Sequence, residues 1–125
     1  MEEKGSSQNT INRIVGYENM DELMNGIQRH IETVEAIGTK IEQGETYLDE
    51  LRGYLPSLNQ MITGIFEMLA DPNRSIELSE EFVLQVLNDI MYGVEQKDSV
   101  FLLDVLRYGL LEIYYYIAAE LQSEG

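Results

Sequence analysis

The chain of 125 residues is long enough for one domain with a core of its own. It carries 23 acidic residues against 8 Lys and Arg, a formal net charge of −15 that disfavours binding to nucleic acid and to anionic membrane surfaces. It has no cysteine, which excludes disulfides, thiolate metal sites and cysteine nucleophiles. The N-terminus lacks the apolar segment of a signal peptide, and no apolar run reaches the roughly 18 residues of a membrane span. We therefore expect a cytoplasmic protein.

The N-terminal residues 1–18 are acidic and polar, and we expect them to form a flexible tail in front of a single domain over residues 19–125. The pattern becomes helical at Asn19, which has the spacing of a capping box with Glu22. Apolar residues then recur every three or four positions, as on one face of an amphipathic helix: Leu23, Ile27, Ile31, Val34, Ile37 and Ile41. Gly44 is expected to end this helix, because glycine adopts the left-handed conformation at no steric cost.

Three further helices are predicted in the rest of the chain. Thr46 and Asp49 resemble a second capping box, after which apolar residues continue in a three-four pattern to residue 69. Ser79 is the expected cap of a third helix, and Asp98 or Ser99 is the expected cap of a fourth. The fourth helix is apolar on nearly all sides, which is typical of a helix that is buried on nearly all sides.

The first two predicted helices could also form a single long one. Their apolar registers run from residue 27 to residue 69 without a phase break, as they would in one helix. A faint internal similarity favours a break, because "IEQGETYL" (41–48) resembles "VEQKDSVF" (94–101), where a turn between helices is expected. With that break, we predict an all-α fold: an up-down four-helix bundle of two αα-hairpins.

The last predicted helix contains three consecutive tyrosines, which cannot share one face because neighbouring helical residues point about 100° apart. Projected around the helix, Tyr114 falls among the core leucines and isoleucines, so its hydroxyl should find a partner. Tyr115 falls on the opposite side with Tyr108, and Tyr116 falls at the boundary with its hydroxyl expected in water. The helix is therefore either central to the fold or presents its tyrosine face to another chain.

Two basic side chains fall at core-facing positions. Arg107 lies on the apolar side of the fourth helix and is expected to pair with Asp104 or with an acid on a neighbouring helix, the alternative being an anion-binding role. His30 is the only histidine and lies between Ile27 and Val34. We expect a hydrogen-bonded histidine there rather than a metal ligand or a general base, because the Glu-x-x-His pattern of di-iron bundles is absent.

Another row of large side chains borders the core stripe of the second helix. Tyr47, Tyr54, Met61 and Met68 recur there every seven residues. They are expected to widen the core, the alternative being a pliable groove for a partner, since methionine adapts to varied surfaces. The chain contains no phosphate-binding glycine loop, nucleophile elbow or zinc motif. We therefore expect a protein that is not an enzyme and that has no catalytic residue, cofactor or metal.

The segment "LNDIMYGVEQKDSVFLLDVLRYGLLEI" (87–113) resembles the C-terminal half of small all-helical domains of unknown function from Gram-positive bacteria. In those domains a helix and a short acidic turn precede a helix with the pattern D-x-V-x-L-x-D-x-L-x-Y. The matching residues here are Asp98, Val100, Leu102, Asp104, Leu106 and Tyr108. The resemblance implies a bacterial cytoplasmic helical domain and brings with it no activity. In size and acidity the expected bundle also resembles bacterial export chaperones.

Together these features predict a non-enzymatic helical module for protein–protein interaction that self-associates as a homodimer. The expected interface lies on the second and fourth helices and consists of Tyr47, Tyr54, Tyr108, Tyr115 and Tyr116. Two alternatives remain open. One is an acidic chaperone or adaptor that binds an amphipathic helix of a secreted or flagellar subunit in a groove. The other is a small-molecule-binding bundle built around His30 and Arg107.

Overall fold

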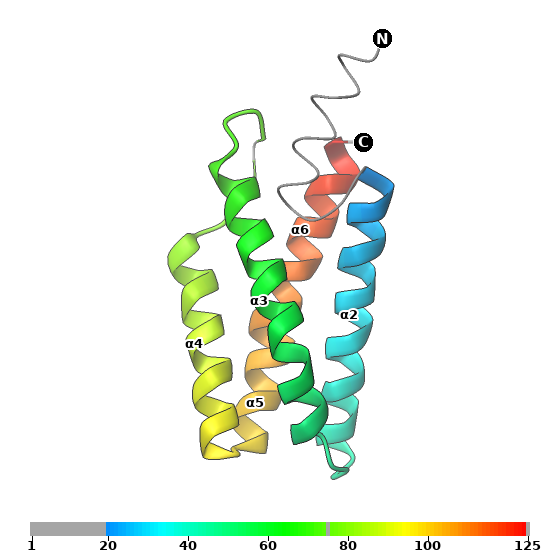
Figure 1. The fold of residues 1–125 in the computed structure, drawn as a ribbon, viewed down its shortest axis with the longest axis vertical. Coiled ribbons are helices and arrows are strands. Elements are labelled where there is room, and N and C mark those ends of the chain that lie inside the picture. The colour runs from blue at the N-terminus through cyan, green and yellow to red at the C-terminus, as the bar shows by residue number, and fades with distance from the viewer. Residues whose placement is uncertain (1–19, 75, 125) are drawn as a thin grey trace.

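A computed structural model describes residues 20–74 and 76–124 of the chain (Figure 1). The described residues form helices and connecting turns with no strand among them, so the predicted all-α fold is confirmed. The helices are α2 (Met20–Glu42), α3 (Leu48–Ala70), α4 (Glu80–Gln96), α5 (Ser99–Val105), the π-helical turn η1 (Leu106–Leu110) and α6 (Leu111–Glu124). The predicted tail over residues 1–18 and the predicted cap at Asn19 lie outside the described residues.

The helices lie side by side, with their axes close to the long axis of the molecule (Figure 1). α5, η1 and α6 follow one another without a gap, and together they form what we call the last helix, over residues 99–124. Its α5 and η1 parts pack against α4, and its α6 part packs mainly against α2. The last helix contacts neighbours along its whole length, which accounts for the burial of most of its apolar surface.

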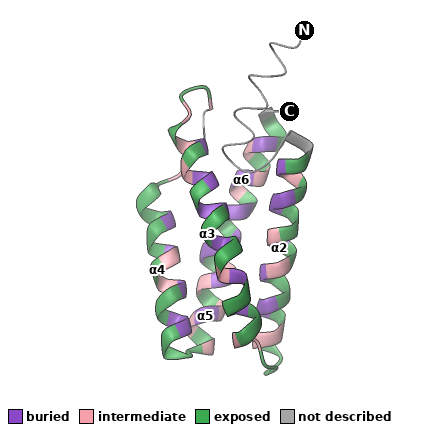
Figure 2. Cartoon of the chain, in the orientation of Figure 1, coloured by how far each residue is buried: buried purple, intermediate pink, exposed green. Residues whose placement is uncertain are grey.

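Apolar side chains that point inward from every helix form the core, whereas the outer sides of the helices are largely exposed (Figure 2). The stripe predicted for α2 is buried from Leu23 to Ile37. In the last helix the buried set is Leu102, Leu106, Leu110, Leu111, Ile113, Tyr114, Ile117 and Leu121. Tyr54, Met61 and Met68 of the flanking row are buried as well, which confirms that these three residues widen the core.

The chain breaks between α2 and α3, so the single long helix is excluded. Gly44 has a φ of 73°, the left-handed conformation predicted for it. The Gly44 N–H donates to the Ile41 carbonyl and the Glu45 N–H donates to the Lys40 carbonyl, at 3.1 and 2.8 Å. These two bonds make a Schellman motif, which satisfies carbonyl groups that would otherwise be left free at the helix end.

The turn after α4 repeats this arrangement 53 residues further along the chain. Lys97 has a φ of 54°, its N–H donates to the Val94 carbonyl, and the Asp98 N–H donates to the Gly93 carbonyl. Lys97 therefore takes the part that Gly44 takes in the first turn, although a lysine reaches this conformation only at some steric cost. The two similar sequence segments, 41–48 and 94–101, thus form two similar turns.

Two of the predicted caps are confirmed and one is wrong. The Ser79 hydroxyl accepts from the Phe82 N–H at the start of α4, and the Asp98 carboxylate accepts from the Phe101 N–H at the start of α5. The capping box predicted at Thr46 does not form. α3 begins at Leu48 with Tyr47 in the cap position and no side-chain cap bond. The turn places the helix start one residue later than the motif requires.

A π-helical turn interrupts the last helix, which the sequence had predicted to be regular. This wider turn, η1, rotates the residues that follow it around the helix axis. The rotation brings Leu111 toward the core, where it is 5% exposed, although a regular projection leaves it at the edge. Gly109 lies within η1 against α4, where an added Cβ would stand 3.1 Å from a methyl carbon of Val86. The absent side chain therefore permits close packing between η1 and α4.

Replacing Gly93 with alanine should test the close contact between α4 and α5. The new Cβ would stand 2.6 Å from a methyl carbon of Leu102, a residue that is fully buried and has little room to move. We expect G93A to lower the free energy of unfolding by about 1–3 kcal/mol, measured by urea denaturation. The matched control is G53A, in an exposed helical position where nothing lies within 4 Å. G53A should instead raise stability by about 0.5–1 kcal/mol. Equal effects of the two changes would contradict the packing described here.

Candidate functional site

A chain of polar groups crosses the apolar core and connects three helices. His30 of α2 lies with its Nδ1 2.6 Å from the Tyr54 hydroxyl of α3, and that hydroxyl lies 2.7 Å from the Tyr114 hydroxyl of α6. Tyr114 is 0% exposed and Tyr54 is 8% exposed. The prediction that Tyr114 is a core ring whose hydroxyl finds a partner is confirmed. The expected hydrogen bond of His30 is present too.

Each of these three side chains is positioned by the apolar pattern of its own helix. His30 follows Ile27 by three residues and precedes Val34 by four, so its ring lies at the border of the buried stripe. The imidazole lies 5.5 Å from the Tyr54 ring and 5.7 Å from the Tyr114 ring, measured between centroids. Packing by two aromatic rings fixes the imidazole in place, and the hydrogen bond between Nδ1 and the Tyr54 hydroxyl fixes its rotation.

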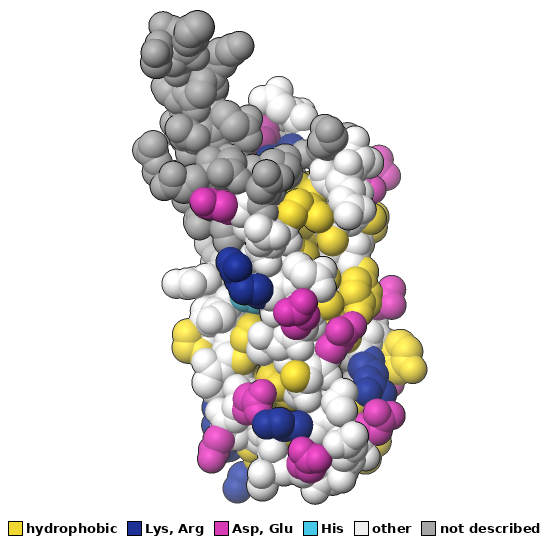
Figure 3. All heavy atoms as spheres, turned by 90° about the vertical axis from the view of Figure 1, so that its right-hand side faces the viewer, with side chains coloured by type: hydrophobic (Ala, Val, Ile, Leu, Met, Phe, Trp, Pro, Cys, Tyr) yellow, Lys and Arg dark blue, Asp and Glu magenta, His cyan; other side chains and the backbone are white. Residues whose placement is uncertain are grey.

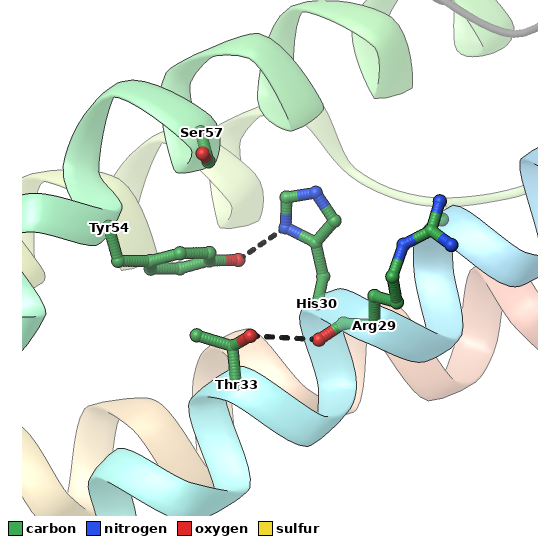
Figure 4. A pocket seen from close by; sticks show the side chains of 6 residues that line it. Arg29, His30, Thr33, Tyr54 and Ser57 are labelled. Atoms are coloured by element: carbon green, nitrogen blue, oxygen red, sulfur yellow. Dashed lines mark hydrogen bonds between the residues drawn. The ribbon is translucent and has the colours of Figure 1, made fainter.

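The His30 end of this chain of polar groups opens into a small pocket between α2 and α3 (Figure 4). The pocket has a volume of about 150 Å³ and is lined by Gly26, Arg29, His30, Thr33, Tyr54 and Ser57. Figure 4 shows Ser57 across from His30, while the Thr33 hydroxyl donates to the Arg29 carbonyl at 3.0 Å. Burial, followed by the nearby Arg29 charge, lowers the pKa of His30 from its usual 6.5. The imidazole is therefore held mainly in its neutral form at neutral pH.

Arg107 forms the ion pair predicted for it, with a partner on a neighbouring helix. Its two terminal nitrogens donate to the two carboxylate oxygens of Glu42 at 3.1 and 3.0 Å, which joins the last helix to the end of α2. The hydrogen bond raises the pKa of Arg107 and lowers that of Glu42. The structure does not bring Arg107 and His30 into one site, because the pockets that they line share no residue.

The five tyrosines predicted as an interface are distributed over different parts of the molecule. Tyr54 is buried in the polar chain, so it is removed from the predicted surface. Tyr47 is half-buried at the start of α3, where burial and then the Asp98 charge raise its pKa. Tyr108 is exposed, and so is Tyr115, whose hydroxyl donates to Glu35 of α2. That hydrogen bond, followed by burial, raises the pKa of Tyr115.

Tyr116 differs from its prediction. Its hydroxyl was expected in water, but it accepts a hydrogen bond from the Glu77 N–H at 3.0 Å. Glu77 belongs to the connection that leads from α3 to α4. Tyr116 therefore fastens this connection to α6, because a segment without helical hydrogen bonds must satisfy its backbone groups by other means.

Exposed apolar side chains gather on the second half of the chain. Among the described residues the large ones are Phe82, Leu84, Met91, Tyr92, Val100 and Tyr108, followed by Tyr115 on α6. The described side chains of α2, from Glu22 onward, and those of α3 contribute none. By contrast, the side of the molecule drawn in Figure 3 carries charged side chains of both signs, with apolar atoms in small groups between them.

Three of these side chains, together with the half-buried ring of Phe101, form what we call the α5 face: Tyr92, Val100, Phe101 and Tyr108. The Tyr92 and Phe101 rings meet edge to face, 5.8 Å apart between centroids. Val100, Phe101 and Tyr108 line an open depression of about 630 Å³ together with Leu103, Asp98, Asp104 and Arg107. Val100 and Tyr108 are 80% and 71% exposed. Tyr108 was among the predicted interface residues, whereas Tyr92 and Val100 were not. Tyr92 could have been found, because a helical projection places it opposite the buried stripe of α4.

The described residues contain neither a cluster suited to a metal ion nor a helix suited to crossing a membrane. No group of three or more His, Asp or Glu side chains converges there in a way that could hold a metal ion. Within the same part of the chain, no helix combines the length and the apolar character needed to cross a membrane. In comparisons with known proteins, no family model, curated protein or solved structure matches this chain.

Replacing Tyr54 with phenylalanine should cost more stability than the same change at Tyr114. Y54F removes the central hydroxyl and takes that hydrogen-bond partner from both His30 and Tyr114, whereas Y114F leaves the His30–Tyr54 bond in place. We expect Y54F to lower the free energy of unfolding by about 1–3 kcal/mol, and Y114F to lower it less. Urea denaturation of both variants measures the difference. A smaller loss for Y54F would contradict the central position of this hydroxyl.

The lowered pKa of His30 should make stability depend on pH. Because the folded state binds the proton less well than the unfolded state, the contribution of His30 is fully present above pH 6.5 and is lost as the pH falls through the lower folded pKa. We therefore expect the free energy of unfolding of the wild type to fall, relative to that of H30Q, when the pH is lowered from 7.5 to 5.5. Parallel urea titrations of the two proteins give this difference. The pH-dependent contributions of the acidic residues are common to both proteins and therefore cancel. A constant difference would contradict the burial of a neutral imidazole.

Proposed function

We propose that this chain is a non-enzymatic helical module for protein–protein interaction that self-associates as a homodimer through the α5 face. The observation that carries this proposal is the gathering of exposed apolar side chains on α4, α5 and η1. Exposed aromatic patches are typical of protein interfaces, and tyrosine is enriched in them. The proposed interface keeps Tyr108 from the sequence-based set and adds Tyr92, Val100 and Phe101.

The composition of the α5 face supports contact with a second protein surface. Its apolar centre is bordered by the acids Asp98 and Asp104 and by Arg107. An apolar centre with a polar border is the usual arrangement of an interface. Arg107 is already paired with Glu42, so the free charges at the border are mainly acidic. Two copies of this face would therefore attract each other through their apolar parts and repel each other through their charges.

The architecture that presents this face is proposed to be an up-down four-helix bundle of two αα-hairpins. The matching Schellman turns at Gly44 and Lys97 support it, since each reverses the chain between two helices. The resemblance of residues 87–113 to small domains from Gram-positive bacteria covers the second half of α4, α5, η1 and the first residues of α6, so we extend the proposal to a bacterial cytoplasmic protein. The acidic chaperone or adaptor would use the same face for a partner of another sequence.

The double substitution Y92S/Y108S should weaken self-association and leave the fold intact. Both side chains are mostly exposed, at 55% and 71%, so their removal takes away interface area but little core. Light scattering on a sizing column, over a hundredfold concentration range, should give a dimer for the wild type. The variant should dissociate at concentrations at least about tenfold higher than the wild type does. Its helicity by circular dichroism should not change.

The matched control for this experiment is Y115S. Tyr115 lies in the last helix, as Tyr108 does, but outside the α5 face. This tyrosine is 43% exposed and its hydroxyl donates to Glu35 of the same chain. Y115S should keep the dimer. Equal weakening by Y115S would move the interface to α6, and a wild type that stays monomeric at every concentration would contradict self-association and favour the adaptor.

Salt should strengthen the proposed dimer. Two copies that each carry a formal charge of −15 repel each other, and at about 0.15 M ionic strength this repulsion is screened over roughly 8 Å. We expect the dissociation constant to fall when sodium chloride is raised from 20 to 300 mM, as measured by sedimentation equilibrium. A dimer held together by ion pairs would instead weaken as salt is added.

A further inference from the structure

The pocket beside His30 differs in charge from the rest of the molecule. The chain has 23 acidic residues, yet none of the six residues that line this pocket is an acid. By contrast, the depression at the α5 face includes Asp98 and Asp104, and a further pocket beside Tyr115 includes Glu35. The lining instead brings together an arginine, a histidine, two hydroxyl side chains and the Tyr54 hydroxyl. Such a set provides hydrogen-bond donors and positive charge but no negative charge.

Arg29 has no carboxylate partner among the described residues. Lys40 pairs with Glu50, Arg74 with Asp71 and Arg107 with Glu42, whereas no such ion pair involves Arg29. Figure 4 shows the Arg29 and His30 side chains projecting from neighbouring positions of α2, with Ser57 of α3 on the other side. A planar guanidinium without a partner at the edge of a pocket is suited to binding a carboxylate or a phosphate.

The polar chain behind the pocket prepares His30 to donate toward it. Nδ1 is occupied by the Tyr54 hydroxyl, and the other ring nitrogen, Nε2, points away from Tyr54 (Figure 4) and has no hydrogen-bond partner in the described part of the chain. When Tyr54 donates to Nδ1, the ring proton resides on Nε2, which is then a donor. When the ring is protonated, both nitrogens donate, and the two tyrosine hydroxyls can turn to accept and pass on the inner hydrogen bond.

The groups that face His30 from each packed element favour a bound anion. They are Arg29 from α2, Tyr54 from α3 and Tyr114 from α6. None of the three carries a negative charge at neutral pH, so the protonated imidazole lacks a counter-ion. The pocket volume of about 150 Å³ is several times the space that one water needs, and it suits a group of four or five heavy atoms. We infer that this pocket binds a small oxyanion of the phosphate or carboxylate class through Arg29, His30 and Ser57.

His30 itself provides the readout for the test. It is the only histidine, so in tag-free protein the single imidazole Cε1–H resonance follows its titration without further assignment. A bound anion stabilises the charged ring, so the pKa of His30 should rise with increasing inorganic phosphate and reach a plateau. Sodium chloride at matched ionic strength should not reproduce the rise. If phosphate and chloride give the same titration curve, the inference is overturned.

Two arginine variants distinguish phosphate binding in this pocket from a general effect of removing one positive charge. R29Q should weaken phosphate binding about tenfold or more, because it removes a charged donor. The matched control is R52Q, since Arg52 is exposed on α3 outside the pocket lining. R52Q should bind phosphate as the wild type does. Equal effects of the two changes would overturn the site. Circular dichroism checks that both variants remain folded.

Two further measurements determine the class of anion and the contribution of the second helix. Acetate in place of phosphate distinguishes the sources of the oxyanion. A rise with both anions indicates a general oxyanion site, and a rise with phosphate alone indicates the phosphate class. S57A should weaken binding about threefold or more, since it removes one neutral hydroxyl donor, and an unchanged affinity would overturn the contribution of α3. Phosphate should also raise the thermal midpoint of the wild type more than that of R29Q.

Discussion

The hydroxyl of Tyr114 lies in a fully buried position, and a buried hydroxyl is stable only when it is hydrogen-bonded. This requirement determines where Tyr54 must lie, and through Tyr54 it determines the position of His30. The three residues belong to α6, α3 and α2, so one polar group in the core sets the relative positions of three helices. A purely apolar core would permit more than one such arrangement, whereas a chain of directed bonds is satisfied in one.

The other half of the molecule is positioned by close contacts instead of hydrogen bonds. Gly93 lies against Leu102, and Gly109 lies against Val86, so α4 and the first half of the last helix approach closely. The π turn at η1 falls in this region and rotates the residues that follow it, so that Leu111 is buried as well as Tyr114. The large side chains on the outer sides of these elements, Tyr92, Val100 and Tyr108, are exposed on the α5 face.

The two candidate sites use the charge of the molecule in opposite ways. The α5 face is bordered by acids, so the association proposed for it would depend on apolar contact and would benefit from screening. The pocket beside His30 is lined by hydrogen-bond donors and by no acid, which sets it apart from the largely acidic rest of the chain. Both arise at the border of the core, where a helix presents side chains that are neither fully buried nor fully exposed. One fold therefore presents the proposed interface and the proposed anion pocket at separate places.

The periodicity of apolar residues by itself determined the helices, most of the core and the identity of Tyr114 as the core tyrosine, because burial follows the helical repeat directly. The turn at Gly44 was readable for the same kind of local reason. Only the tertiary structure decided that Tyr54 bonds to His30 and Tyr114, that Arg107 pairs with Glu42, and that the Thr46 cap does not form. The three side-chain contacts depend on which helix lies opposite which, and residues 24 to 65 positions apart along the chain carry no local signal of their contact.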